Sequence, residues 1–552
     1  MPAAWGLEPP TVAFDSFEYT GHDAVFTLPL PAASYRNPIL AGFHPDPSVT
    51  RVGDRYYLVN STFSYFPGIP VFESADLVHW RQIGNVIDRT SELNFDGLGV
   101  SRGIFAPSIR FHAGVFYVAA TAVDAGGNFL SVARNPAGPW SDPIWLPQLD
   151  GIDPSLFFDD DDRAYLLNNG PPPGKARYEG HRAIWMQQID LATRRLIGPR
   201  RVLINGGVHP RTHPVWIEGP HLYQRAGWYY LMCAEGGTST QHSEVILRSR
   251  TVWGPFRAYR ANPILTQRDL SAGRVNPIAD VGHADLVVGP DERWWAVFLG
   301  VRPYQHVHFN TGRETFLLPV TWRHGWPIIE QRDTPVPYVA LAPTAADGAG
   351  NDTPAETTSG NFRWRDDFNQ AQLSSQWLYL RAPRQPWADL RSRPGWLTIH
   401  ALPLSLDTLG NPTFLGRRQQ HTSFEASTAL ELPLEERVAA DIALFEDEHH
   451  WYFFGARRHG DAVQIFLDKD AGGGSRVVGQ ITASGAPDAV AGRSIRLKVS
   501  GQAQDYSFYY DVDGGPWRAL VEADDGSILS TDLSGGFVGT MLGPYARSEA
   551  AR

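Results

Sequence analysis

Between Tyr35 and Leu341 the chain is a succession of short apolar runs, each broken by glycine, proline or acidic residues. Five runs share one order: a small or acidic residue, often a proline, a short polar residue, then an apolar strand. They begin at Asp46-Pro47-Ser48, Ala106-Pro107-Ser108, Asp153-Pro154-Ser155, Gly219-Pro220-His221 and His283-Ala284-Asp285. After a hairpin turn, each is followed by an aromatic-rich strand. A repeat of about 50 to 65 residues with four short strands is typical of a propeller blade.

These repeats predict a five-bladed β-propeller over residues 34–341, because a single two-sheet sandwich would not explain five similar units. Residues 342–361 are small and polar with glycine and proline, so we expect a linker. Residues 362–552 alternate strand-like runs without a useful amphipathic helix, which predicts a β-sandwich. Residues 1–33 are expected to form an N-terminal extension. The predicted fold class is all-β.

Composition narrows the function classes. The 552 residues include 18 Trp, 53 Gly and 43 Pro, which favours many short strands joined by turns. The net charge of −11 argues against nucleic acid or an anionic membrane as a partner. Aromatic richness with modest charge suits a neutral ligand that stacks on rings, such as a sugar.

Cysteine usage and the chain start bear on compartment and assembly. Cys233 is the only cysteine, so an internal disulfide and a cysteine-based metal site are excluded. The start at Met1 shows no basic and apolar leader, and no apolar run approaches a membrane span, so we expect a cytoplasmic protein. The sequence leaves the choice between a monomer and a homo-oligomer open.

Alignment of the five repeats gathers charged side chains at one place. The first strand of each blade lines the central channel, so its leading residue is expected at the channel mouth. Asp46, Asp153 and His283 hold this position, and Glu218 lies one residue before it in blade four. Three carboxylates at one mouth raise one another's pKa, and such a cost is typical of a functional site.

Glycoside hydrolysis gives these carboxylates a use. An inverting enzyme needs a base that activates water and a separate acid, with the carboxyl groups roughly 6.5–9.5 Å apart. Blades one and four lie across the channel, so we expect Asp46 to be the base and Glu218 the acid. Asp153 is expected to keep Glu218 protonated and to orient it. His283 and Arg313 are expected to hold hydroxyls and to offset negative charge.

The chain also resembles glycoside hydrolase family 43, in the branch of β-xylosidases and α-L-arabinofuranosidases with a concanavalin-like C-terminal sandwich. The matching runs are Asn37 to Ser48, Ser61-Thr62-Phe63, Phe66-Pro67-Gly68, Ser74 to Trp80, Glu218 to Tyr223, Ala234 to Thr238 and Gly312 to Thr315. The resemblance implies exo-acting, inverting release of a terminal pentose, β-D-xylose or α-L-arabinofuranose, from xylan-derived or arabinoxylan oligosaccharides.

The resemblance implies the same roles for Asp46, Glu218 and Asp153, and places Arg313 and His283 at the innermost subsite. It implies that Phe63 packs against the pentose and that His242 stands where relatives carry a histidine. Phe105 stands where many relatives have tryptophan, which leaves the choice of pentose open. No cofactor is required, although the resemblance allows for a structural calcium ion held near His283 through water.

Two other readings share parts of this pattern. A non-catalytic, carbohydrate-binding propeller with a lectin-like sandwich would have the same folds and aromatic residues, but it does not predict three converging acids. A retaining, fructan-type five-bladed hydrolase shares the propeller, but its nucleophile segment differs from the one around Asp46.

Overall fold

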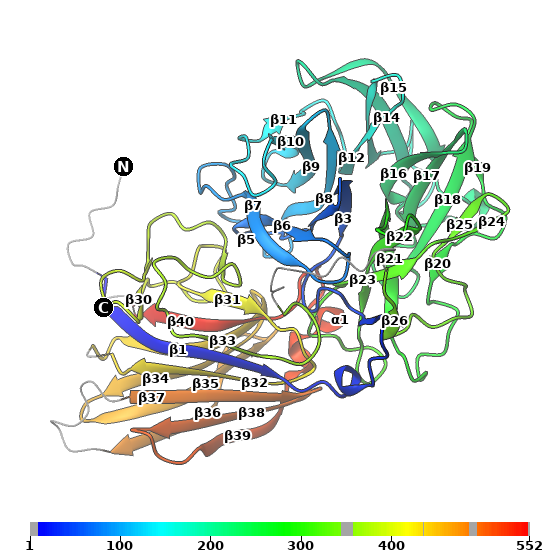
Figure 1. The fold of residues 1–552 in the computed structure, drawn as a ribbon. Helices are drawn as coiled ribbons and strands as arrows, with labels where there is room; N and C mark the ends of the chain where they lie inside the picture. Colours follow the sequence, from blue (N-terminus) through cyan, green and yellow to red (C-terminus); the bar gives the residue numbers. More distant parts are fainter. Residues whose placement is uncertain (1–8, 344–356, 434, 485–493, 550–552) are drawn as a thin grey trace.

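The computed structural model describes residues 9–343, 357–433, 435–484 and 494–549, and it contains a propeller and a sandwich (Figure 1). Most of the expected linker, residues 344–356, lies outside the described part. Within that part, short 3-10 turns and one short helix are the only helical elements: η1 (Ala24–Thr27), η2 (Pro210–Thr212), η4 (Gly526–Leu529) and α1 (Thr531–Ser534). None of them is long enough to cross a membrane.

Each of the first four propeller blades is an antiparallel sheet whose strands follow one another along the chain. Blade one contains β3 (Ser48–Val52), β4 (Arg55–Val59), β6 (Gly68–Ser74) and β7 (Arg81–Ile87). Blade two contains β8 (Gly103–His112), β9 (Val115–Val123), β10 (Gly127–Ala133) and β11 (Ile144–Trp145). Blade three contains β12 (Ile152–Phe158), β13 (Ala164–Gly170), β14 (Ala183–Asp190) and β15 (Arg195–Asn205). Blade four contains β16 (Glu218–Arg225), β17 (Trp228–Glu235), β18 (Ser243–Ser249), β19 (Arg257–Ala258) and the short β20 (Leu265–Thr266).

Blade five differs from the predicted four-strand repeat, because its own sheet has three strands. These are β21 (Ala279–Val288), β22 (Trp294–Val301) and β23 (Glu314–Pro319), followed by the separate hairpin β24 (Thr321–Arg323) and β25 (Trp326–Ile328). The fourth position is taken by the segment before blade one. Ile39 N donates to Thr315 O at 2.8 Å, and the Asn37 side chain bonds the backbone of Leu317 at 2.9 and 3.0 Å. Pairing of β2 (Ser34–Arg36) with β26 (Val339–Leu341) completes this closure of the ring.

The sandwich consists of two sheets of eight strands, with a core of aliphatic and aromatic side chains between them. One sheet contains β1 (Thr11–Gly21), β27 (Arg363–Asp366), β29 (Ala388–Asp389), β30 (Leu397–His400), β32 (Ser423–Glu431), β37 (Ser494–Gln502), β38 (Asp505–Val512) and β39 (Arg518–Asp525). The other contains β5 (Tyr65–Phe66), β28 (Leu378–Leu380), β31 (Leu415–Arg418), β33 (Val438–Asp447), β34 (His450–His459), β35 (Ala462–Ala471), β36 (Arg476–Ser484) and β40 (Met541–Ser548). Residues 11–21, which sequence analysis placed outside both domains, are therefore a strand of the sandwich (Figure 1).

The two domains are joined by one strand of the propeller segment that pairs with a sandwich sheet, and by buried polar contacts. β5 belongs to the propeller segment by sequence, yet it extends a sandwich sheet by pairing with β28. Arg381 of the sandwich is fully buried, donates from its backbone N–H to Ser64 O at 2.9 Å and forms an ion pair with Glu448. Glu448 also accepts a hydrogen bond from Val100 N of the propeller at 3.0 Å. This interface fixes the loop that carries Phe63 at the channel mouth.

Candidate active site

The same backbone conformation occurs at the channel end of four blades. Asp46, Asp153, Gly219 and His283 have φ of 51°, 56°, 53° and 51°, in the left-handed region. In blades two to five the innermost strand also carries a register shift at this point. Such bulges re-aim side chains at the rim of a sheet. The predicted repeat position is therefore a structural device that turns side chains into the channel mouth.

Gly219 explains why the acid of blade four lies one residue earlier than in blades one and three. A Cβ atom at Gly219 would lie 2.9 Å from the imidazole of His283, closer than side chains tolerate. Glycine also adopts the required positive φ without strain. The blade-four acid is therefore displaced to Glu218, whose side chain lines the same pocket as Asp46 and Asp153.

Asp46 is held as a carboxylate. It is buried, and its two oxygens accept hydrogen bonds from Ser61 Oγ at 2.5 Å and Arg313 Nη1 at 2.9 Å. Burial by itself would raise its pKa, but the charges of Arg313 and His283 and the Ser61 hydrogen bond lower the pKa below its usual value. Asp46 is consequently ionised at neutral pH, which is the state that a general base requires.

Glu218 is held in the opposite protonation state. Burial, followed by the nearby negative charge of Asp153, raises the pKa of Glu218 to about 8. Asp153 itself is fixed by the backbone N–H of Gly219, which donates to Asp153 Oδ2 at 3.1 Å. Two carboxyl groups whose environments drive their pKa values apart identify the acid and the base. The pocket therefore combines a protonated Glu218 with an ionised Asp46.

His283 supplies a positive charge among these acids. Its Nε2 lies 3.6 Å from Asp153 Oδ2. Burial by itself would lower its pKa, but the hydrogen bond to Asp153 and the charges of Asp46 and Asp153 raise the pKa to about 10. A protonated His283 thus offsets part of the negative charge that Asp46 and Asp153 bring together.

An aromatic wall closes one side of the pocket. The rings of Phe63, Phe105 and Phe537 contact one another, with centroids 5.0 to 5.8 Å apart. The Arg313 guanidinium lies 5.8 Å from the Phe63 ring and 5.6 Å from the Phe537 ring, and its Nη2 donates to Phe537 O at 3.2 Å. An apolar wall beside charged groups excludes water and suits the carbon face of a sugar.

Phe537 comes from the sandwich, and sequence analysis did not identify it. The feature of the sequence that could have indicated a close contact here is the preceding pair Gly535-Gly536, and both glycines have a φ of 78°. A Cβ at Gly536 would lie 2.3 Å from Ser101 Oγ, and Ser101 Oγ accepts a hydrogen bond from Phe537 N at 2.9 Å. The close approach of these glycines to the propeller therefore places Phe537 in a pocket whose other lining residues all belong to the propeller.

The pocket has a volume of about 800 Å³, and seven of the eight predicted site residues line it. They are Asp46, Phe63, Phe105, Asp153, Glu218, His283 and Arg313. The eighth residue, His242, does not line the pocket. It is buried, its Nδ1 lies 2.9 Å from Asp280 O, and its Nε2 has no hydrogen-bond partner among the described residues. Burial lowers the pKa of His242 to about 4, so its ring is neutral. Two further lining residues that sequence analysis missed are Trp216 and Arg182, at the mouth.

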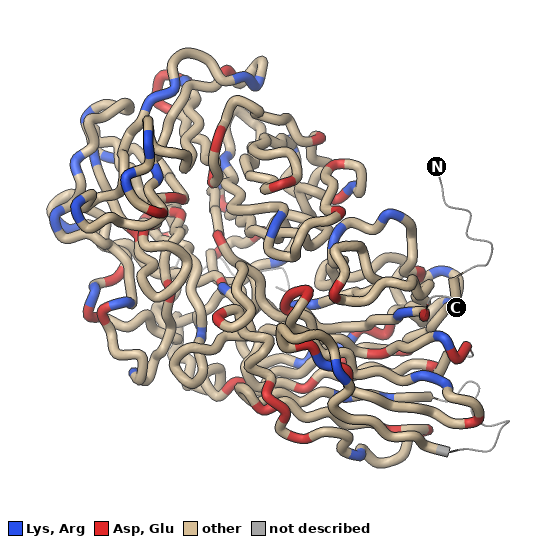
Figure 2. The backbone as a smooth tube through the Cα atoms, turned by 180° about the vertical axis from the view of Figure 1, so that it is seen from behind, with Lys and Arg blue, Asp and Glu red and all other residues tan. Residues whose placement is uncertain are grey.

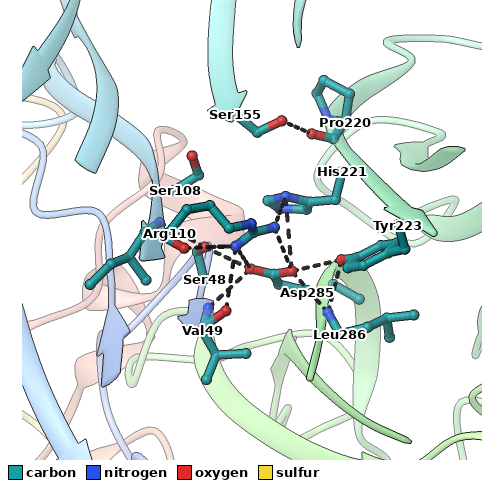
Figure 3. Close-up of polar contacts among 12 residues, drawn as sticks. Ser48, Val49, Ser108, Arg110, Ser155, Pro220, His221, Tyr223, Asp285 and Leu286 are labelled. Atoms are coloured by element: carbon teal, nitrogen blue, oxygen red, sulfur yellow. Dashed lines mark hydrogen bonds and ion pairs between the residues drawn. The ribbon is translucent and has the colours of Figure 1, made fainter. Parts of the chain in front are cut away.

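Two residues after Asp46 and His283 along the innermost strands, Ser48 and Asp285 belong to a buried polar centre (Figure 3). Asp285 is fully buried and accepts hydrogen bonds from Ser48 Oγ at 2.7 Å, Tyr223 Oη at 2.6 Å and both terminal nitrogens of Arg110 at 2.7 and 3.0 Å. Arg110 also lies 2.8 Å from His221 Nδ1. Burial by itself would raise the pKa of Asp285, but Arg110 and the other donors hold it well below its usual range. One carboxylate thereby joins blades one, two, four and five.

The family resemblance allows for a calcium ion held through water near His283, whose Nδ1 is buried and has no hydrogen-bond partner among the described residues. Among the described residues, no group of three or more His, Cys, Asp or Glu side chains is arranged to hold a metal ion. Arg110 places a permanently charged guanidinium in this channel, against Asp285.

A five-bladed propeller whose pocket holds an ionised Asp46 and a protonated Glu218 has the fold and the acid–base pair of a glycoside hydrolase. Two family models match the chain: Glycosyl hydrolases family 43 over residues 35–327, and the Beta xylosidase C-terminal Concanavalin A-like domain over residues 365–552. The chain therefore belongs to glycosyl hydrolase family 43. This membership confirms the predicted five-bladed propeller with a concanavalin-like sandwich and excludes the binding-module and fructan-type readings.

Individual relatives agree along nearly the whole chain. A xylosidase/arabinosidase of Butyrivibrio fibrisolvens is 38% identical over 519 residues, covering 93% of this chain and 95% of that protein. A non-reducing end alpha-L-arabinofuranosidase of Bacteroides ovatus is 33% identical over 522 residues, covering 93% and 91%. The crystal structure of a GH43_12 protein retrieved from capybara gut metagenome is 37% identical, with a TM-score of 0.90 and coverage of 98% and 100%.

Proposed function

We propose that this protein is an exo-acting, inverting hydrolase that removes a terminal pentose, β-D-xylose or α-L-arabinofuranose, from the non-reducing end of xylan-derived oligosaccharides. The observation that carries the proposal is that one pocket holds Asp46, paired with Arg313 and Ser61, together with Glu218, which is buried near Asp153 and has a raised pKa. The names of the relatives, xylosidase/arabinosidase and non-reducing end alpha-L-arabinofuranosidase, support the sugar class.

In the proposed reaction, a water molecule attacks the anomeric carbon while Asp46 takes its proton. Glu218 gives its proton to the glycosidic oxygen as the bond from that oxygen to the anomeric carbon breaks. The net change adds one water across the glycosidic bond and leaves Asp46 with one more proton and Glu218 with one fewer. Proton exchange with solvent then returns Asp46 to the carboxylate and Glu218 to the acid. Arg313 holds Asp46 in place and keeps it ionised between turnovers.

Two features support action at a chain end. The aromatic wall of Phe63, Phe105 and Phe537 bounds one side of the pocket, and the buried Asp285 centre joins the innermost strands of four blades just beyond the acids. A pocket bounded in this way accommodates a terminal sugar rather than the middle of a polysaccharide.

The pentose is identified by parallel assays on an aryl β-D-xyloside and an aryl α-L-arabinofuranoside. We expect hydrolysis of at least one, with kcat/KM within the range of about 10⁴–10⁸ M⁻¹s⁻¹ that is common for enzymes acting on good substrates. Phe105 is the residue through which the choice between the two sugars is expected to be made, because it forms part of the wall. Absence of hydrolysis on both aryl pentosides would reject the proposed function.

The pH profile of kcat/KM should be a bell whose alkaline limb falls near pH 8. Activity is lost as pH rises through about 8, because Glu218 then loses the proton that it must donate. The acid limb should lie below the usual carboxyl range, because the pKa of Asp46 is lowered. In Asp153→Asn, loss of the neighbouring charge lowers the pKa of Glu218, so the alkaline limb should move to lower pH. An alkaline limb that stays in place, or moves to higher pH, would contradict the role given to Asp153.

We also propose that turnover needs no metal ion, because the Arg110 guanidinium already supplies the positive charge in the channel. Treatment with EDTA should leave kcat and the thermal midpoint unchanged. A fall in either quantity that calcium restores would overturn this statement.

A further inference from the structure

Trp216 is a fixed aromatic surface at the mouth of the pocket. It stands two residues before Glu218 and lines the same cavity. Its backbone has a φ of 50°, and its backbone N–H donates to Gly180 O at 2.9 Å. The carbonyl of the preceding residue, Val215, accepts a hydrogen bond from Gly236 N at 2.9 Å. A bulky residue keeps a left-handed conformation only where its surroundings enforce it. Trp216 therefore lines the pocket from a fixed backbone position, two residues from the group that protonates the leaving oxygen.

Arg182 lies against this indole, with its guanidinium carbon 4.0 Å from the ring centroid. It also lines the pocket and is partly exposed. Among the described residues its side chain contacts no carboxylate, whereas the other two arginines that line the pocket are paired, Arg102 with Asp124 at 2.6 Å and Arg313 with Asp46 at 2.9 Å. An arginine stacked on a ring keeps its N–H donors in the guanidinium plane, where a carboxylate can accept two of them.

The loops around Arg182 are basic although the whole chain is acidic. Residues 171–182 and 205–216, which lead into the mouth, carry Lys175, Arg177, Arg182 and Arg211 against the single acid Glu179. Figure 2 shows blue segments, with red ones among them, along the propeller edge that lies on the left in that view, the side of blades three to five. Local positive charge at a pocket mouth raises the concentration of anionic ligands there, whatever the net charge of the protein.

We propose that Trp216 and Arg182 form a leaving-group subsite for an acidic oligosaccharide, so that the preferred substrates carry a uronic acid on the sugar from which the terminal pentose is released. This inference rests on the proposed function, because the subsite is defined by its place beside Glu218. The indole supplies the apolar contact and the guanidinium binds the carboxylate.

The test compares two aryl glycosides of whichever pentose the enzyme accepts: one with a 4-carboxyphenyl leaving group, the other with a 4-carbamoylphenyl group of the same shape and no charge. The quantity measured is the ratio of kcat/KM for the charged to the neutral probe. In Arg182→Gln we expect this ratio to fall by about tenfold, the loss typical of one hydrogen bond to a charged group. Arg182→Lys should retain part of the ratio. The matched control is Arg211→Gln, an exposed residue of the same loops outside the pocket. This variant removes one distant charge and no contact with the probe, so its ratio should fall much less than that of Arg182→Gln.

A second measurement needs no variant. Raising the salt concentration shortens the Debye length to about 3 Å at 1 M, so KM for the charged probe should rise while KM for the neutral probe stays constant. An unchanged ratio in Arg182→Gln, an equal fall in Arg211→Gln, or equal salt dependence for both probes would overturn the acidic subsite while leaving the pentosidase intact. Failure to hydrolyse either probe would instead reject the proposed function, and this inference with it.

Discussion

Replacing Asp46 with asparagine is expected to lower kcat by about 10³–10⁴-fold, the upper part of the range for loss of a general acid or base. The amide keeps the shape of the side chain and still accepts a hydrogen bond from Ser61, but it takes no proton from water. The loss should be the same for aryl leaving groups of any acidity, because the base acts on the nucleophile. The measurement is a series of kcat values on aryl pentosides with leaving groups of graded pKa.

The matched control is Asp54→Asn, in the exposed hairpin turn of the same blade, which should have wild-type kcat. The thermal midpoint of Asp46→Asn shows whether Arg313, left without its carboxylate partner, disturbs the fold. A folded Asp46→Asn protein with wild-type turnover would remove Asp46 from the mechanism.

Glu218→Gln should give a loss that depends on the leaving group. With an alkoxide or sugar leaving group we expect kcat to fall by about 10³–10⁴-fold, because these groups depart only when protonated. With a 2,4-dinitrophenyl group, which leaves without a proton, the loss should be about tenfold or less. The alkaline limb near pH 8 should also disappear, since its titrating group is gone.

Glu235→Gln is the control for Glu218→Gln. Glu235 is also a buried glutamate of blade four, and burial raises its pKa. Its Oε2 accepts a hydrogen bond from Val208 N at 2.9 Å, and the residue does not line the pocket. Its variant should keep both the wild-type rate and the alkaline limb. A loss in Glu218→Gln that is equal for good and poor leaving groups would assign Glu218 a structural role instead.

Much of the site was predictable because a propeller converts sequence repetition into spatial convergence. Asp46, Asp153 and His283 occupy one repeat position, so alignment of the repeats was enough to bring them together. The displacement of Glu218 by one residue was visible in the sequence, but its cause, the contact between Gly219 and the ring of His283, depends on the distance between blades four and five.

The features that sequence analysis missed depend on contacts between distant segments. Phe537 reaches the pocket through the packing of the sandwich on blade two, which no repeat encodes. Residues 11–21 form a sandwich strand through pairing with β30 and β32, which lie far away in the sequence. Trp216 and Arg182 lie before or between the aligned strands, where the repeat pattern carries no information.

The measurement that tests the central claim most directly is the configuration of the sugar at the moment of its release, followed by proton NMR during hydrolysis of the preferred aryl pentoside. The account assigns Asp46 to water and Glu218 to the leaving oxygen, so the first product signal should be the anomer opposite to the substrate, with the other anomer growing in only by mutarotation. A first-formed product with the configuration of the substrate would show that a carboxylate attacks the sugar directly, and would contradict the roles given to both residues.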